Sequence, residues 1–337
     1  MIIVPMDVHA ASFTYVTMTA KGQHSRAVKR PMSAQELIAA VQAIAGPKTV
    51  VIEEGPEAQW LKETLRRDAD HVVICDPRQN RLIAEANFID DAHSAIALGE
   101  LYLGGYTKEV VHPDTQGAEL RRHFIHYYGW NRHLVRAKSQ LKAAFRQAGV
   151  HATGSNVYAP RHREQYREQL ASEPALREHA ERLWELIDLV EAAKSKALQS
   201  GYRLARKNKA YALMDSLPGA DKVISTGYVA LIGTASRFPK KNRLWSYFGL
   251  GNKRQLSGHT KDSTEASQGG NRIGKWLVGQ HCRAVLNRKD SNRFKEHYLD
   301  CRSNGLSEGD AQRSTCRCLL SVARTLWIKG EKYNESL

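Results

Sequence analysis

Short apolar runs alternate with amphipathic segments through the first third of the chain. Apolar, partly β-branched runs predict strands at residues 2–8, 12–19, 48–53 and 71–75, and residues 22–30 are expected to add a further strand. Apolar side chains at helical spacing predict helices over residues 34–45 and 57–67. Ser33 is the expected N-cap of the first of these helices. This part of the chain is therefore predicted to be α/β.

The order of these elements narrows the fold. Three strands followed by helix, strand, helix and strand match a ribonuclease-H-like sheet flanked by helices, although periodicity alone also allows other α/β folds. Two strands end in an acid, Asp7 and Glu53, and Asp90 and Asp91 open the next helix. A buried acid at a strand end needs a partner, and a metal ion is a usual one, whereas a lone aspartate more often only caps its strand. The additional acids favour the metal site.

Residues 114–148 are helical in period and strongly basic. Aromatic and histidine side chains are interleaved with the cations, as in surfaces that bind a nucleic-acid backbone and unstacked bases. An equally good interpretation is a helix that packs its aromatics into a core and keeps its charges in water. The basic residues taken as candidates for nucleic-acid binding are Arg121, Arg122, Arg132, Arg136, Lys138 and Lys142.

A loop at residues 149–159 is the clearest domain boundary. Beyond it, residues 160–210 are helical, and apolar residues recur every seven positions at Leu176, Leu183, Val190 and Ala197. This spacing predicts a coiled coil or a helical hairpin that protrudes as an arm. A Leu-Pro-Gly turn at residues 217–219 resembles a helix-hairpin-helix element. Residues 211–332 are predicted to form an all-α C-terminal domain.

The charge of the chain bears on its partners. Its 337 residues include 50 Lys and Arg against 35 Asp and Glu, which gives a net charge of +15. A strongly basic protein most often meets a polyanion, and nucleic acid is the first candidate. No apolar run approaches the roughly 20 residues of a membrane span, and no signal peptide is recognisable. The five cysteines form no CxxC pair. We therefore expect a cytoplasmic protein without a membrane partner.

One serine lies in a polar segment rich in cations. Ser257 is followed by glycine in a stretch that we expect to be flexible. A serine hydroxyl attacks phosphorus when nearby cations stabilise its alkoxide and neutralise the phosphate, but a loop serine is by itself ordinary. The neighbouring cations, taken as further candidates for nucleic-acid binding, are Lys253, Arg254, Lys261, Arg272 and Lys275.

The order and spacing of several short motifs resemble a known family. The N-terminal motifs are MDVH at residues 6–9, EEGP at 53–56 and CDPRQN at 75–80. The C-terminal motifs are LPGA at 217–220, RF at 237–238, YFGL at 247–250, LSG at 256–258 and GGNRIGKWL at 269–277. Together they span nearly the whole chain. They resemble the insertion-sequence transposases with a DEDD motif, which are relatives of the Piv-type DNA invertase.

The resemblance implies a RuvC-type N-terminal domain over residues 1–150 whose four acids bind Mg²⁺. By position, the first three acids are Asp7, Glu53 and Asp91. The fourth falls on Ser94, where this chain departs from the family pattern. Asp90 or His93, one residue away, could complete the set instead, or the fourth ligand is the serine hydroxyl. Because magnesium keeps several water ligands, three carboxylates can still form a site.

The resemblance also implies the chemistry. The nucleophile of the family corresponds to Ser257, which would attack a DNA phosphodiester and form a phosphoserine link before the strands are rejoined. Asp7, Glu53 and Asp91 would assist through Mg²⁺. The implied partners are donor and target DNA, a structured guide RNA, and further copies of the chain in a homodimer or homotetramer.

Three functions are therefore weighed. The first is an RNA-guided serine recombinase that transposes an insertion sequence. The second is a Mg²⁺-dependent Holliday-junction-type nuclease that hydrolyses DNA with the N-terminal domain alone. The third is a catalytically silent nucleic-acid-binding protein, which Ser94 makes plausible. A protein–DNA adduct that depends on Ser257 would distinguish the first from the others.

Overall fold

The computed structural model describes residues 1–77, 90–257, 261–266 and 269–335, with the side chains of residues 253–268 outside the description. The chain divides into two compact units, Met1–Thr115 and Gln116–Leu337. Each unit has hydrophobic clusters of its own.

The first unit is built on one five-stranded sheet. Its strands are β1 (Ile2–Val8), β2 (Ser12–Tyr15), β3 (Val28–Pro31), β4 (Lys48–Glu53) and β5 (His71–Cys75). They lie in the order β3-β2-β1-β4-β5, with β1, β4 and β5 parallel and β2 and β3 antiparallel to their neighbours. The ranges predicted for β1, β4 and β5 are confirmed. The other two strands are shorter than predicted, because Met18 and His24 make only isolated bridges.

Helices cover both faces of this sheet. They are α1 (Ala34–Gln42), α2 (Ala58–Leu65) and α4 (Asp91–Leu103). Val4 and Met6 of β1 belong to the cluster that includes α1 and α2. Ile3, which precedes Val4 and therefore faces the other side of the sheet, belongs to the cluster that includes Leu98 of α4. The sheet therefore has α1 and α2 on one face and α4 on the other.

One glycine sets how closely α4 approaches the sheet. A Cβ atom at Gly99 would lie 2.8 Å from Cγ of Pro5 and 2.9 Å from Cε of Met18. Only a residue without a side chain fits at this distance. Gly99 therefore lets α4 pack closely on Pro5 of the strand that carries Asp7.

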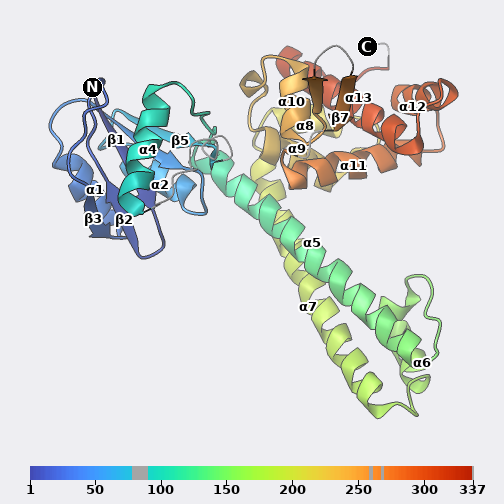
Figure 1. Cartoon of the computed structure of the whole chain (residues 1–337). Helices are drawn as coiled ribbons and strands as arrows, with labels where there is room; N and C mark the ends of the chain where they lie inside the picture. The colour runs from blue at the N-terminus through green and yellow to red at the C-terminus, as the bar shows by residue number, and fades with distance from the viewer. Residues whose placement is uncertain (78–89, 258–260, 267–268, 336–337) are drawn as a thin grey trace. The chain divides into compact units, whose positions relative to one another are not determined.

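The second unit contains a long helical arm. In it α5 (Thr115–Gln147) runs out to a tip that carries α6 (Arg163–Glu168), and α7 (Pro174–Ala205) returns beside it (Figure 1). Apolar residues of both helices form one cluster, in which Leu183 and Val190 of the predicted seven-residue pattern are buried with Leu141 of α5. The indole Nε1 of Trp184 donates a hydrogen bond of 2.7 Å to the carbonyl of Val157. The arm is a hairpin of two helices.

The rest of the second unit is a helical core. Its helices are α8 (Ala210–Asp215), α9 (Lys222–Ile232), α10 (Lys241–Tyr247), α11 (Arg272–Leu286), α12 (Arg293–Ser303) and α13 (Glu308–Lys329). Leu120, Phe124 and Tyr127 of α5 are buried in the same core. The predicted first domain extends to residue 150, whereas the compact unit ends at Thr115, because the first part of α5 packs with the C-terminal helices. Among the described residues, no helix is long and apolar enough to cross a membrane.

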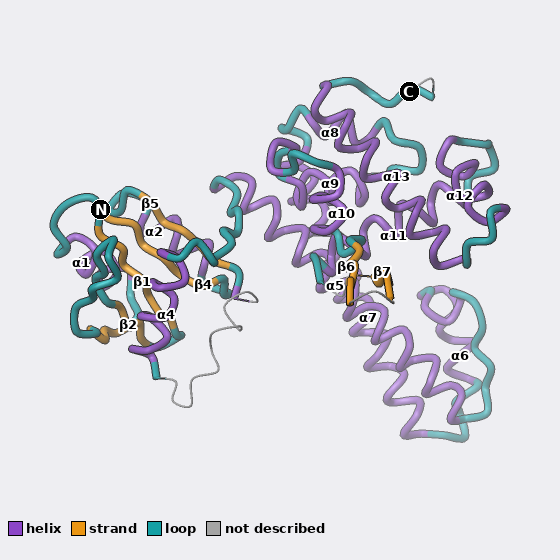
Figure 2. The backbone as a smooth tube through the Cα atoms, turned by 45° about the horizontal axis from the view of Figure 1, so that its top comes forward, coloured by secondary structure: helices purple, strands orange, loops and turns teal. Residues whose placement is uncertain are grey.

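The C-terminal part is not all-α as predicted. Strands β6 (Asn252–Ser257) and β7 (Lys261–Ala266) pair antiparallel from Asn252↔Ala266 to Ser257↔Lys261 (Figure 2). The segment expected to be flexible around Ser257 is therefore partly a strand. The two strands contain mainly polar residues and lack the apolar alternation of a half-buried strand, so no strand signal was present. Pairing of backbone N–H and C=O groups forms the ladder without that signal.

Candidate active site

Two acids lie side by side where neighbouring parallel strands end. The pairing of β1 with β4 runs to Met6↔Ile52, and Asp7 and Glu53 are the next residues. Since side chains alternate along a strand, these two acids lie on the face opposite Met6, which is the face covered by α4. Glu53 is near enough that its charge contributes to raising the pKa of Asp7, although burial is the larger cause.

The third acid comes from the first turn of α4. Asp90 is the N-cap, with extended backbone, and its carboxylate accepts a hydrogen bond of 2.7 Å from the backbone N–H of His93. The helix therefore begins at Asp91, whose carboxylate accepts a hydrogen bond of 2.8 Å from Lys29 of β3. This hydrogen bond is the main cause of the lowered pKa of Asp91.

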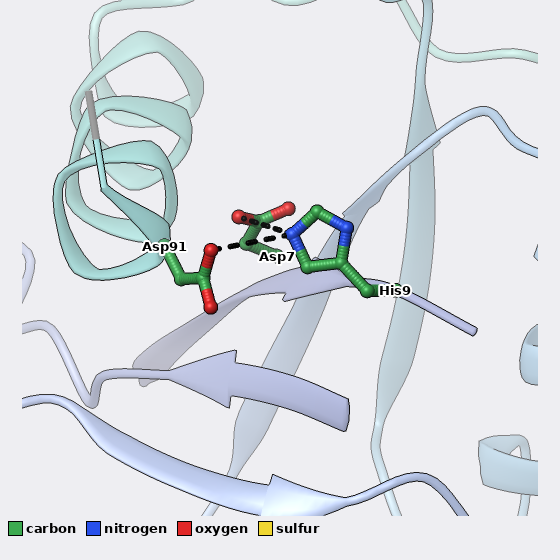
Figure 3. A group of neighbouring side chains, drawn as sticks. All are labelled: Asp7, His9 and Asp91. Carbon is green, nitrogen blue, oxygen red and sulfur yellow. Dashed lines mark ion pairs between the residues drawn. The ribbon is translucent and has the colours of Figure 1, made fainter. Parts of the chain in front are cut away.

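His9 joins Asp7 and Asp91 into one cluster (Figure 3). Its Nε2 atom lies 3.4 Å from Oδ2 of Asp7 and 3.4 Å from Oδ1 of Asp91. One ligand atom from each of the three side chains falls within 4.8 Å of the others. Burial is the main cause of the raised pKa of Asp7, and the charge of Asp91 adds to it, while His9 opposes it. A cation between the carboxylates would relieve this repulsion.

The residues present fit a divalent cation. Carboxylate oxygens are the ligands that magnesium prefers, and it needs few of them because it retains water. An imidazole nitrogen adds a ligand suited to zinc. Asp7, Asp91 and His9 come from β1, α4 and the segment after β1, so the fold brings distant parts of the sequence to one point.

The other acids and polar residues considered for this site lie differently. The Asp90 carboxylate caps α4 and contacts Nδ1 of His93 at 2.9 Å, so both side chains have one another as partners. Ser94 lies one helical turn after Asp91 and is half-buried. The carboxylate of Glu54 lies 2.6 Å from Nε2 of His112. Glu54 is thus directed to a partner outside the cluster.

His9 belongs to the MDVH motif but was not among the site residues predicted from the sequence. The signal was present, because His9 lies two positions after Asp7 in an extended segment, and such residues share a face. Lys29, whose ion pair with Asp91 spans 62 positions of sequence, was not among them either. No local pattern identifies a contact of that kind.

The structure places the backbone of Ser257 at the end of β6, paired with Lys261. Its hydroxyl and the side chains of Lys253, Arg254 and Lys261 are outside the described residues. Arg272 and Lys275 lie exposed in the first turn of α11, whose N-cap is Asn271.

The two motifs that flank this hairpin contact each other at its base. Gly270 has a φ of +105°, and a Cβ atom there would lie 2.4 Å from the backbone nitrogen of Gly249. The N–H of Asn271 donates a hydrogen bond of 2.7 Å to the carbonyl of Tyr247. Arg317 donates to the carbonyl of Leu250 at 2.7 Å. The strand that ends in Ser257 is therefore anchored to the helical core.

The basic helix α5 has some aromatic side chains buried in the core and others exposed beside its cations, so each of the two interpretations of its sequence fits part of it. Phe124 and Tyr127 are buried in the core, whereas Trp130 is 39% exposed. Lys138 lies 2.7 Å from Glu191 and Lys142 lies over the ring of Tyr158. The remaining candidates on this helix are half-buried Arg121 and exposed Arg122, Arg132 and Arg136.

Residues 211–299 match the family model described as Transposase IS116/IS110/IS902 family. This match supports an insertion-sequence transposase. It covers the C-terminal helical core from α8 into α12, including the β6–β7 hairpin. A transposase acts on DNA, so the match also supports DNA as a partner. A comparison with curated proteins finds no match.

Proposed function

We propose that the chain is an insertion-sequence transposase that cuts and rejoins DNA through Ser257, assisted by a Mg²⁺ ion at the acidic cluster. The observation that carries the proposal is the convergence of Asp7 and Asp91 in one cluster, as the position-by-position resemblance requires. The family match over residues 211–299 supports the same assignment from the other half of the chain.

The residues that would hold the ion are Asp7, Glu53 and Asp91, with Ser94 or His9 in the fourth position. His9 already contacts both aspartates, and Asp90 and His93 have each other as partners. A bound Mg²⁺ supplies a positive charge that stabilises negative charge on the reacting phosphate. Lys29 leaves one oxygen of Asp91 occupied and so fixes the orientation of that carboxylate.

Ser257 would carry the covalent step. The Ser257 hydroxyl gives up its proton as Oγ attacks a DNA phosphorus, a bond from Oγ to phosphorus forms, and the bond from phosphorus to one sugar oxygen breaks. The leaving sugar oxygen takes a proton and becomes a free hydroxyl. Attack by a hydroxyl of another strand reverses these steps and releases the serine. The number of phosphodiester bonds is conserved, so no energy source is needed.

The remaining partners follow from charge and resemblance. A net charge of +15 suits a protein that binds two polyanions. We propose donor and target DNA, with a structured guide RNA that reads sequence by base pairing while the protein contacts the backbone. The active assembly is a homodimer or homotetramer that supplies the acidic cluster and Ser257 to one phosphate.

A denaturing gel tests the serine. The chain, purified with the RNA that it retains from cells carrying its gene and flanking DNA, is incubated with that flanking DNA and Mg²⁺. We expect an adduct that survives denaturation in the parent and in Ser263→Ala, a matched serine on β7, but not in Ser257→Ala. An adduct that persists in Ser257→Ala contradicts the proposal.

The acidic cluster on an α/β sheet also favours a second candidate, a metal-dependent nuclease that hydrolyses DNA junctions. In that case Asp7→Asn abolishes cutting, Ser257→Ala leaves it unchanged, and no adduct forms. A transposase of the proposed kind loses strand exchange in both variants. If the chain binds nucleic acid but neither cuts nor joins it, the remaining candidate, a silent binding protein, is supported.

A further inference from the structure

The tip of the helical arm carries a cavity of about 510 Å³. Ser139, Lys142 and Arg146 line it from the last turns of α5, at spacings that place them on one helix face. His151, Thr153 and Gly154 line it from the loop that follows. The positive φ of Gly154, +68°, is part of the turn that brings this loop back toward α5.

The charge of this cavity is of one sign. Lys142, Arg146 and His151 are basic, and none of the described residues that line the cavity carries a carboxylate. In the described part of the arm, the side chains of Arg146 and His151 have neither an ion pair nor a hydrogen bond, and Lys142 contacts only the ring of Tyr158, 5.5 Å from its centroid. The hydroxyls of Ser139 and Thr153 are likewise unpartnered within the described residues.

Three other cations of the arm are paired with acids. Lys138 pairs with Glu191 at 2.7 Å, Arg163 pairs with Asp188 at 2.6 Å, and Arg167 pairs with Glu181. These pairs explain why the arm tolerates many charges. The cavity residues differ because the arm supplies them with no counter-charge, so like charges gather where an anion could enter.

The chemistry of the lining suits a phosphodiester. The guanidinium of Arg146 can donate two parallel hydrogen bonds to two phosphate oxygens, and Lys142 adds a point charge. Two hydroxyls can donate further hydrogen bonds. The volume lies within the range of pockets for small organic ligands, about 300–1,000 Å³, and so has room for a nucleotide rather than a bare phosphate.

The position of the cavity favours a long polyanion. Tyr127 of α5 is buried in the helical core, and Arg146 lies 19 positions farther along the same helix. At 1.5 Å per residue this places the cavity about 28 Å from that point of the core, or about eight base pairs of duplex. A nucleic acid engaged at the core can extend that far, whereas a small anion has no reason to prefer the tip.

We propose that the arm tip is a docking site for the phosphodiester backbone of a nucleic acid that the chain binds. This inference rests on the proposed function, which requires RNA and DNA partners, and adds a contact far from the reacting phosphate. Lys142 and Arg146 hold the phosphate oxygens, and Ser139, His151 and Thr153 complete the contact.

The test compares two charge-matched variants of the full chain. Lys142→Gln/Arg146→Gln removes two cations from the cavity. Arg182→Gln/Lys196→Gln removes two exposed cations from α7 outside it. Glutamine is a good helix former, so both variants should keep the arm, which circular dichroism checks. Affinity is measured against a 40-nucleotide RNA hairpin and a 40-base-pair DNA duplex over a series of salt concentrations.

We expect the cavity variant to bind at least one probe about tenfold more weakly, and the control variant to change less than threefold. The slope of log affinity against log salt should fall by about 1.4 to 1.8 for two lost phosphate contacts. Weakening on the hairpin alone identifies RNA as the occupant, and weakening on the duplex alone identifies DNA.

Equal behaviour of the two variants on both probes overturns the inference. So does a cavity variant that loses affinity for polyglutamate but not for either nucleic acid, because the occupant is then an acidic protein. A parent chain that binds neither probe overturns the proposed function as well. A parent that binds and recombines DNA while the cavity variant is unaffected removes only the docking site.

Discussion

At the acidic cluster, individual side chains explain where the carboxylates lie and why they repel one another. Asp7 is at the end of a buried strand, and its pKa is raised by burial and by the charges of Asp91 and Glu53. Lys29 and His9 offset part of this repulsion. The positions of these acids can be read from the sequence, because Asp7 and Glu53 end apolar runs and Asp91 opens a helix. The sequence did not identify Lys29 or His9, whose roles depend on packing between distant segments.

The raised pKa of Asp7 has a consequence for stability. At pH values between the ordinary pKa of an aspartate and the higher pKa of Asp7 in the fold, the folded state binds more protons than the unfolded state. The free energy of unfolding therefore falls as pH rises through this range. At neutral pH without metal, Asp7→Asn should therefore raise Tm slightly, by roughly 1–3 °C for a gain under 1 kcal/mol. Thermal unfolding in EDTA measures this. With added Mn²⁺ the parent should have the higher Tm, because only the parent gains stability from binding the ion. An equal rise in Tm for Asp7→Asn argues against Asp7 as a ligand.

The imidazole of His9 should select among metals. Magnesium prefers oxygen ligands, whereas zinc accepts nitrogen. We expect His9→Ala to weaken Zn²⁺ binding about tenfold or more and Mg²⁺ binding about twofold, measured by isothermal titration calorimetry. His93→Ala, which alters the histidine paired with Asp90, is the matched control. An equal loss for both metals would indicate that His9 is not a ligand.

One buried histidine, His281, should control the acid stability of the C-terminal core. The Nε2 of His281 lies 2.9 Å from the carbonyl of Pro218, and its Nδ1 lies 2.8 Å from the hydroxyl of Tyr228. Since the carbonyl accepts, Nε2 donates and Tyr228 donates to Nδ1. Burial lowers the pKa of His281 to about 4.

The lowered pKa of His281 makes the folded chain less stable at acid pH. Below pH 6.5 the unfolded state binds a proton that the folded state does not, so the free energy of unfolding falls as pH falls, by about 2 kcal/mol from pH 7 to pH 5. His281→Gln keeps a donor and an acceptor but cannot titrate. Denaturant unfolding at pH 7 and pH 5 should show that His281→Gln loses about 2 kcal/mol less than the parent between the two pH values. An equal loss in both would contradict the lowered pKa of His281.

At the scale of elements, the strands that carry Asp7 and Glu53 were predictable because a buried parallel strand is a continuous apolar run. The β6–β7 hairpin was not, because its residues are mainly polar and its position depends on tertiary contacts. Gly249 and Gly270 meet at its base, and Arg317 contacts the carbonyl of Leu250. The strand ending in Ser257 is thus placed by contacts outside the hairpin.

Gly270 tests that anchoring. Its positive φ and the 2.4 Å approach of a Cβ atom to the nitrogen of Gly249 leave no room for a side chain. Gly270→Ala should destabilise the chain by about 1–3 kcal/mol. Gly279→Ala, inside α11 with nothing within 4 Å of the added Cβ atom, should instead stabilise it by about 0.5–1 kcal/mol. Denaturant unfolding of the two variants measures the difference; a neutral Gly270→Ala would show that the base of the hairpin is not tightly packed.

At the scale of the whole chain, composition indicated a polyanionic partner, and the net charge remains the simplest reason to expect nucleic acid. The division into units was harder to predict. Apolar positions on α5 show that one face is buried, but they do not show which core covers it. Leu120, Phe124 and Tyr127 pack with the C-terminal helices, and later residues of the same helix pack with α7. One helix therefore joins the arm to the C-terminal core.

The central claim is that a serine of the C-terminal unit and the acids of the first unit act on one DNA phosphate. Mass spectrometry of the trapped protein–DNA adduct, after digestion by protease and nuclease, tests it most directly. We expect a nucleotide linked through phosphate to the peptide that contains Ser257, and no such peptide in EDTA or in Asp7→Asn. A nucleotide on any other residue, or cut DNA with no linked peptide, would contradict it.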